Sequence, residues 1–236
     1  MQPHVIAETD DLLVLDKPAG LIVHSDGRTE EPSLAEWVAE NYPELANIGE
    51  PWVSPQGEHV QVSGIVHRLD RTTSGVMLVA KNREMFTYLK NEFKERRVEK
   101  IYWAHVYGDM EEEGSIVAEI MRSNSVPKRW YARPCDESDK RAAITKWRVL
   151  ARLIDPETGK HVTRLEVRPL TGRTHQIRVH MASIGHPIVS DHLYAPDRPQ
   201  LLGFKYPALH AYSITVTLLS GERATFMAPA LGTFSQ

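Results

Sequence analysis

A group of charged residues separates two apolar segments near residue 70. An apolar strand ending near residue 67 runs into Arg68, Asp70 and Arg71, and a Thr/Ser/Gly turn leads to a second apolar strand at residues 76–80. A carboxylate flanked by two arginines is expected to stay ionised, because nearby cations favour the charged form. Such a carboxylate can act as a base, a ligand or a nucleophile. A turn aspartate in an ordinary ion pair explains the same pattern.

Residues 168–181 form a second group, which is rich in arginine and histidine. The segment from Thr171 to Thr174 predicts a turn and a helix N-cap, a setting that suits an anion such as phosphate. In the helix, Arg178 borders the apolar stripe of Ile177 and Met181. We therefore expect Arg178 to be partly buried and to need a carboxylate from elsewhere in the chain, which an ordinary structural salt bridge would also supply.

The residues do not indicate a metal or a cofactor. His175, His180, His186 and His192 are close in sequence, but their spacings of five and six residues do not match the i, i+4 pair of a helical zinc site. The single cysteine, Cys135, excludes a thiolate cage. The glycines match neither a dinucleotide-binding pattern nor a P-loop. We predict no metal and no cofactor.

The two groups need a scaffold in which short strands outnumber helices. Strands are predicted at residues 5–7, 12–15, 21–23, 65–67, 76–80, 101–107, 116–120, 143–153, 163–170, 213–219 and 223–227, and helices begin at Ser33, Asn82 and Thr174. Most connections are too short for parallel crossovers. We therefore predict an α+β fold, a single catalytic domain over residues 1–236 with a largely antiparallel or mixed sheet, flanking helices and loops, and an active-site cleft between two lobes.

The charge of this 236-residue chain is unevenly distributed. The net charge is −3, yet residues 1–60 hold 2 basic and 12 acidic residues, whereas residues 122–178 hold 14 basic and 6 acidic ones. A polyanion responds to local potential, so the basic stretch could bind nucleic acid, although a solvated basic face explains it equally well. The sequence has no run of 18 apolar residues and no signal-like start, which predicts a cytoplasmic protein without a membrane partner.

Five stretches, in order along nearly the whole chain, resemble motifs of the RluA-type pseudouridine synthases, enzymes that isomerise uridine in structured RNA. They are HRLD-x-x-TSG at residues 67–75, NKPxGL at 16–21 with Asp16 for the usual Asn, K-x-Y at 100–102, RTHQIRVH…GHP at 173–187, and LHA at 209–211. Two departures concern the family's GD-x-x-YG, which here reads SDHLYA at residues 190–195, and a His-Pro that is absent before the final hairpin. The first motif lies so near residue 1 that we expect the short form, without an N-terminal S4-like RNA-binding domain.

The resemblance implies a role for individual residues. Asp70 would be the catalytic aspartate, Arg178 would pair with it, and Tyr102 would stack on the uracil. Arg68 would fill the space left by a uridine flipped out of its stack. The residues expected to contact the RNA are Arg71, Lys100, Arg173 and His175, together with Lys128, Arg129, Arg133, Lys140 and Arg141 of the basic stretch.

Two other function classes stay open. A glycosidase-like hydrolase would use Asp70 with a second carboxylate and would release free uracil. An RNA-binding protein without activity would be expected to lack Asp70 or Tyr102, and both are present. The resemblance implies ribosomal or transfer RNA, or both, as the partner of a monomer. It leaves open whether Asp70 attacks C1′, adds to C6 or removes the C2′ proton.

Overall fold

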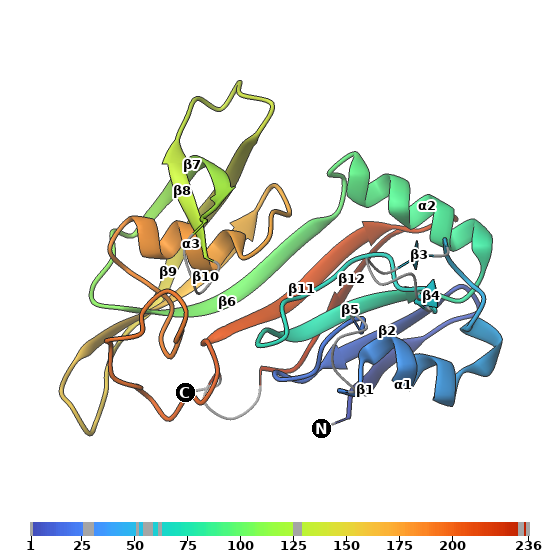
Figure 1. Cartoon of the computed structure of the whole chain (residues 1–236), viewed down its shortest axis with the longest axis horizontal. Coiled ribbons are helices and arrows are strands. Elements are labelled where there is room, and N and C mark those ends of the chain that lie inside the picture. The colour runs from blue at the N-terminus through green and yellow to red at the C-terminus, as the bar shows by residue number, and fades with distance from the viewer. Residues whose placement is uncertain are drawn as a thin grey trace. The chain divides into compact units, whose positions relative to one another are not determined.

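The chain folds into two compact units (Figure 1). A computed structural model describes residues 2–25, 31–50, 52–53, 59–60, 63–124, 129–230 and 234. Unit 1 comprises Met1–Glu99 and Ser213–Pro229, and unit 2 comprises Lys100–Tyr212 and Ala230–Gln236. The chain thus crosses between the units more than once, so neither unit is a continuous segment.

Unit 1 is built on a sheet with the strand order β1-β2-β5-β11, and β12 also pairs with β11. The strands are β1 (His4–Glu8), β2 (Leu12–Lys17), β5 (Ser74–Ala80), β11 (Leu209–Thr217, of which residues 213–217 belong to this unit) and β12 (Arg223–Met227). A separate hairpin joins β3 (Trp52–Val53) to β4 (His59–Val60). Helix α1 (Leu34–Asn41), the short 3-10 helix at Pro43–Leu45 and helix α2 (Arg83–Lys94) complete the unit.

Both helices of unit 1 begin where the sequence predicts. Ser33 caps α1, its hydroxyl accepting from the Glu36 N–H at 3.2 Å while the Glu36 carboxylate accepts from the Ser33 N–H at 2.8 Å. The Asn82 side chain accepts from the Met85 N–H at 2.8 Å and caps α2. These bonds satisfy amide groups that have no partner inside the helix. The caps therefore fix the first turn of each helix.

Unit 2 is an antiparallel sheet covered on one face by a single helix. From β6 (Glu99–Tyr107) the strand order continues through β10 (His161–Pro169), β9 (Ala142–Ile154) and β7 (Glu113–Arg122) to β8 (Trp130–Pro134). Helix α3 (Gln176–Ser183) contributes Ile177 and Met181 to a buried cluster with Leu165 and Val167 of β10. This cluster sets the face of the sheet on which α3 lies.

The predicted fold class is confirmed, because the helices accompany a sheet whose strand pairs are mostly antiparallel. Within the described residues, no helix is both long enough and apolar enough to cross a bilayer. The predicted strand at residues 21–23 is wrong. The carbonyls of Ile22 and Val23 instead accept from the N–H groups that begin α1, and the Leu21 carbonyl accepts from the Lys17 ammonium.

Two further local predictions need correction. Residues 65–67 make only an isolated bridge between Ile65 and Val79. Helix α3 begins two residues later than predicted, because His175 adopts the left-handed conformation (φ 53°) and makes no side-chain cap. Strand β8, an edge strand with mostly half-buried or exposed residues, carries no clear apolar alternation and was not predicted from sequence.

Unit 2 encloses two histidines that burial keeps neutral. His105 packs against the rings of Phe204 and Phe234, at centroid distances of 5.0 and 5.6 Å, and burial, with a smaller effect of the Arg164 charge, lowers its pKa to about 3. His180 shares a 2.9 Å hydrogen bond with the Thr145 hydroxyl, and burial lowers its pKa to about 4. Both pKa values lie below that of an unfolded histidine, about 6.5.

We therefore expect the free energy of unfolding to fall as the pH drops from about 6.5 toward 4, because only the unfolded chain takes up these protons. Each histidine adds a slope of up to about 1.4 kcal/mol per pH unit. Urea denaturation at pH 7.5 and 5.0 measures it. The variant His105→Phe should lose one histidine's share of the slope, whereas exposed His192→Gln should keep the wild-type slope. Equal acid sensitivity in His105→Phe and wild type would contradict the assignment.

Candidate active site

The segment that carries Asp70 is held against β5 by backbone and side-chain contacts. The Gly64 N–H donates to the Ile48 carbonyl at 2.6 Å, and the Gly64 carbonyl accepts from the Ala80 N–H at 2.8 Å. Gly64 has a φ of +72°, and a Cβ there would lie 2.1 Å from the Ala80 carbonyl oxygen. Only glycine fits this close approach. The start of the segment that carries Asp70 is thus fixed by the backbone.

His67 fixes the middle of the same segment. Its Nε2 accepts from the Leu78 N–H of β5 at 2.9 Å, and its ring stacks on Phe93 of α2 with 4.6 Å between centroids. The imidazole thereby replaces a backbone strand partner. Beyond it Arg68 is exposed, Leu69 is buried and Asp70 is half-buried. The chain is therefore anchored at its buried residues, while Arg68 and part of Asp70 are exposed to solvent.

Lys17 is a buried cation that sequence reasoning missed as a contributor to this site. Its side chain has no exposed surface, and its ammonium donates to the carbonyls of Pro18 (2.9 Å), Leu21 (2.9 Å) and Arg71 (3.2 Å). Burial lowers the pKa of Lys17 to about 7, against the opposing effect of the negative charge of Asp70. Lys17 therefore ties the turn that follows Asp70 to the end of β2.

We expect Lys17→Met to reduce kcat by about 100-fold, because the Asp70 turn loses its anchor and small misplacements of a reacting group carry costs of that size. RNA affinity should stay within a few fold, since the side chain is buried. Single-turnover rates at saturating RNA measure the effect. Lys81→Met, which removes a lysine paired with Glu8 at the end of β5, is the matched control. A Lys17→Met rate within threefold of wild type would remove Lys17 from the site.

Arg71, predicted to contact RNA, forms an ion pair in unit 1. Its guanidinium lies 2.6 Å from the Glu31 carboxylate, and both side chains are about half exposed (49% and 47%). A pair this exposed contributes little to stability and leaves the guanidinium open to exchange of partners. The Arg71 carbonyl also accepts from the Gly20 N–H at 2.8 Å. The backbone of Arg71 is thus structural, while its side chain faces water.

In unit 2, Tyr102 lies on the face of the sheet that α3 covers. It is paired with Val167 of β10 in the antiparallel register, and it packs against the buried cluster to which Ile177 and Met181 contribute. Tyr102 itself is only half-buried. A tyrosine combines an apolar ring with a polar hydroxyl, so partial burial suits both a core role and stacking on a ligand.

Arg178 is buried and holds a carboxylate, as its position beside the apolar stripe predicts. Its Nε and Nη2 donate to the two carboxylate oxygens of Asp191 at 2.7 and 2.8 Å, and Asp191 has no exposed surface. The Arg178 guanidinium also lies over the Tyr194 ring, 5.1 Å from its centroid. This two-point pair fixes the plane of the guanidinium.

His175 and Tyr194 form a second contact between the same segments. The Tyr194 hydroxyl lies 2.8 Å from His175 Nδ1, and the rings meet edge to face. Residues 190–195 differ from the family's GD-x-x-YG pattern at its two glycines. Asp191 and Tyr194 match the aspartate and the tyrosine of that pattern. The structure shows that this stretch supports Arg178 and His175.

Lys100 of β6 and the turn that precedes α3 are joined by further hydrogen bonds. The Lys100 ammonium lies 3.5 Å from the Thr171 carbonyl. The Arg173 N–H donates to the Gln176 Oε1 at 3.0 Å, and the Thr171 hydroxyl donates to the same oxygen at 2.7 Å. Gln176 therefore caps the turn where a phosphate was predicted. The side chain of Arg173 is exposed and free to contact RNA there.

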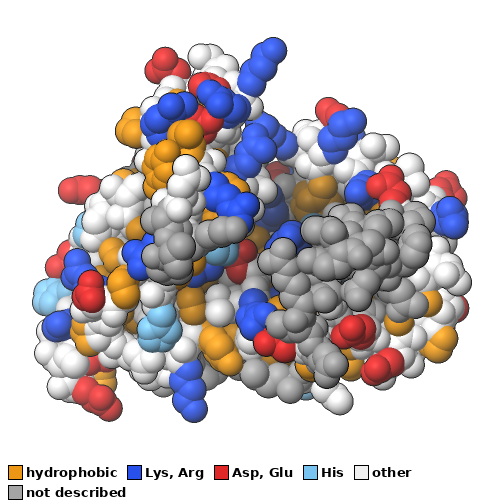
Figure 2. Space-filling view, in the orientation of Figure 1, with side chains coloured by type: hydrophobic (Ala, Val, Ile, Leu, Met, Phe, Trp, Pro, Cys, Tyr) orange, Lys and Arg blue, Asp and Glu red, His pale blue; other side chains and the backbone are white. Residues whose placement is uncertain are grey.

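Part of the basic stretch is engaged in ion pairs. Figure 2 shows Lys and Arg side chains, with a few acidic ones, over the end of unit 2 that carries β7, β8 and β9. There Arg133 and Arg141 both pair with the buried Glu119 carboxylate. Arg129 is half-buried, whereas Lys140 is exposed. Lys128 lies outside the described residues.

Comparisons with known proteins identify the family of the chain. Residues 11–183 match the family described as RNA pseudouridylate synthase. The chain belongs to this family. It is 35% identical over 227 residues to an uncharacterized RNA pseudouridine synthase of Synechocystis, covering 95% of this chain and 64% of that protein. It is 34% identical to the dual-specificity RNA pseudouridine synthase RluA of Vibrio parahaemolyticus, covering 89% of this chain and 76% of that one.

The chain also resembles a solved structure of a protein with an RNA pseudouridylate synthase domain. The human RNA pseudouridylate synthase domain containing 1 is 26% identical, with a TM-score of 0.70, covering 97% of this chain and 83% of that one. A relative from Aquifex aeolicus, described as an uncharacterized RNA pseudouridine synthase, is 38% identical over 192 residues. The chain spans 55% of the length of the Aquifex relative and 64% of the Synechocystis one.

Proposed function

We propose that the protein is an RNA pseudouridine synthase that uses Asp70 on a flipped-out uridine. The observation that carries the proposal is the anchored HRLD segment. His67 and the buried Lys17 hold this segment in place, and its half-buried Asp70 stands in a chain of the RNA pseudouridylate synthase family. Isomerisation breaks the N1–C1′ bond of uridine and joins C5 to C1′, with no net gain or loss of atoms. An ionised carboxylate can assist it by attack at C1′, by addition to C6 or by removal of the C2′ proton.

We propose Asp70, Tyr102 and Arg178 as the residues that act on the uridine, as the family resemblance implies. Arg178 would keep the carboxylate charged and oriented, because an adjacent cation favours the ionised form. Tyr102 would stack on the uracil, and its hydroxyl could help to move the C5 proton. Two observations support this: the half-buried Tyr102 ring, and the Asp191 carboxylate that fixes the Arg178 guanidinium.

The proposed substrate is structured RNA, ribosomal or transfer or both, modified in the cytoplasm by a monomer. The Vibrio parahaemolyticus relative is named a dual-specificity enzyme, and a 32% identical relative from Haemophilus ducreyi is named ribosomal large subunit pseudouridine synthase D. These names support RNA of either kind. Arg71, Lys100, Arg173 and His175 are the proposed contacts to the RNA around the uridine.

Arg68→Ala should slow turnover far more on a stacked or base-paired uridine than on the same uridine in a flexible loop. The exposed Arg68 would fill the gap that a flipped base leaves, and unstacking costs a few kcal/mol only where the base is stacked. Rates on matched folded and unfolded RNAs measure the contrast. An equal loss on the two RNAs would reduce Arg68 to a phosphate contact.

The function itself is tested by mapping pseudouridine in cellular RNA with and without this protein, using a reagent that adds a bulky tag to pseudouridine. We expect specific uridines of ribosomal or transfer RNA to lose the tag when the protein is absent. Their tag should return with the wild-type chain but not with Asp70→Asn. Unchanged tagging at every uridine would contradict the proposal.

A further inference from the structure

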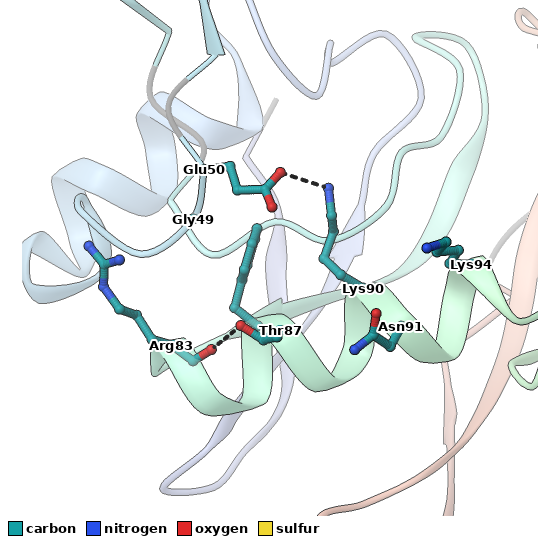
Figure 3. A pocket seen from close by; sticks show the side chains of 8 residues that line it. Gly49, Glu50, Arg83, Thr87, Lys90, Asn91 and Lys94 are labelled. Carbon is teal, nitrogen blue, oxygen red and sulfur yellow. Dashed lines mark hydrogen bonds and ion pairs between the residues drawn. The ribbon is translucent and has the colours of Figure 1, made fainter.

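A groove of about 490 Å³ lies along helix α2 in unit 1 (Figure 3). Gly49 and Glu50 form one side of it, and side chains of α2 form the other. Figure 3 shows Arg83 and Lys90 rising from the helix on the side where Glu50 lies, with Lys94 further along. None of these residues belongs to the candidate active site.

The basic residues of α2 are aligned along one line of the helix. At 3.6 residues per turn, Arg83, Lys90 and Lys94 fall within a sector of about 40°. Thr87 lies on the same line of the helix, between Arg83 and Lys90, and all four residues line the groove. The acidic residues of α2 itself lie off this line; Glu92, for example, is buried and pairs with Arg97. Glu50 lines the groove from the other side. The groove therefore faces a row of cations about 16 Å long.

Two features of this alignment are unfavourable for the helix itself, whereas Lys94 in the last turn suits the helix dipole. Arg83 is the first residue of α2, where the helix dipole favours an anion. Lys90 and Lys94 are four residues apart, where like charges repel. The facing Glu50 carboxylate lies 3.5 Å from Lys90, but it is 78% exposed, so the pair contributes little. A row of cations held against these costs fits an anionic ligand along the groove.

Helix α2 also supports the catalytic segment. The opposite part of its surface packs on the sheet through Met85 and Leu89, and its Phe93 stacks on His67, three residues before Asp70. An RNA strand that presents a uridine to Asp70 must continue on both sides of that uridine. The cationic groove lies on the helix that supports the HRLD segment. Such an RNA strand can therefore run along this groove of unit 1.

We propose that the groove binds the phosphate backbone of the substrate RNA beside the target uridine. The proposal rests on the proposed function and deepens it by naming a surface outside the catalytic motifs. Each phosphate held by a lysine or arginine releases a counterion, so the contact adds affinity and salt dependence without a base preference. Catalysis at saturating RNA does not require it.

The double variant Lys90→Gln/Lys94→Gln tests the proposal. We expect it to weaken RNA binding and to lower the slope of log K against log salt by about 1.5, since each lost contact removes roughly 0.7 to 0.9. The rate at saturating RNA should not change. The control Lys160→Gln/Lys205→Gln removes the same charge from two exposed positions of unit 2 and should keep the wild-type slope.

A variant with the opposite expected effect on RNA affinity completes the test. Glu50→Gln removes the competing carboxylate from an exposed position, so it should tighten RNA binding. Wild-type slopes in the groove variant, or an equal loss in both double variants, would overturn the proposal. Binding is measured without turnover. If the wild type binds RNA through the groove but makes no pseudouridine, the proposed function fails and the groove assignment stands. If the wild type makes pseudouridine but the groove variant binds RNA normally, only the groove assignment fails.

Discussion

Asp70→Asn should abolish pseudouridine formation, with a rate at least about 1,000-fold below wild type. The amide keeps the shape of the side chain but cannot serve as the charged nucleophile or base. RNA affinity should stay within a few fold, because the proposed contacts to RNA lie on other residues. Single-turnover assays and equilibrium binding on one RNA measure the two quantities separately.

Asp16→Asn is the matched control for this prediction. Asp16 directly precedes Lys17 in strand β2, and burial raises the pKa of its carboxyl group, so it is a carboxylate of the same region. It also stands where the family usually has Asn, so the change should leave the rate near wild type. If both variants lost activity equally, the loss would report a general effect of charge near the turn rather than the role of Asp70.

Asp191→Asn should lower the free energy of unfolding by about 3–5 kcal/mol, because it leaves Arg178 buried without its carboxylate. The Asp191 Oδ1 also accepts from the N–H groups of Leu193 and Tyr194, at 3.1 and 3.2 Å. The change therefore loosens both Arg178 and the segment that supports His175. Urea denaturation measures the loss, with exposed Asp197→Asn as the control.

The same variant tests whether Arg178 serves catalysis. If Arg178 orients Asp70, kcat should fall in Asp191→Asn under conditions where the variant is still fully folded. Tyr194→Phe removes only the hydroxyl near His175, so it should reduce RNA affinity more than kcat. Full activity of folded Asp191→Asn would show that the Arg178–Asp191 pair is structural alone.

Local signals in the sequence predicted much of the scaffold. Ser33 with Glu36, and Asn82 before an apolar stripe, predicted both helix starts in unit 1, because caps are formed by neighbouring residues. The strand at residues 223–227 was predicted with the observed boundaries. The strand predicted at residues 21–23 failed, since its carbonyls bond to α1 and to the Lys17 ammonium, contacts that no local pattern encodes.

The candidate site shows the same division. The HRLD segment and Arg178 could be found from residue types, charge and the family motifs, and the need of Arg178 for a carboxylate followed from its place beside an apolar stripe. The identity of that carboxylate, Asp191, depends on how a loop thirteen residues away folds back on α3. The sequence indicated Lys17 only as part of a motif and not as a contributor to the site. Its burial and its hydrogen bond to the Arg71 carbonyl depend on contact between segments 54 residues apart.

The most direct test of the central claim is the product that the purified protein makes from a defined RNA. Nucleoside analysis by mass spectrometry after complete digestion separates three outcomes. We predict conversion of a specific uridine to pseudouridine, an isomer of unchanged mass, with wild-type protein and none with Asp70→Asn. Release of free uracil would indicate a hydrolase. If the protein bound RNA isolated from cells that lack it but formed no pseudouridine in that RNA, the result would contradict the account.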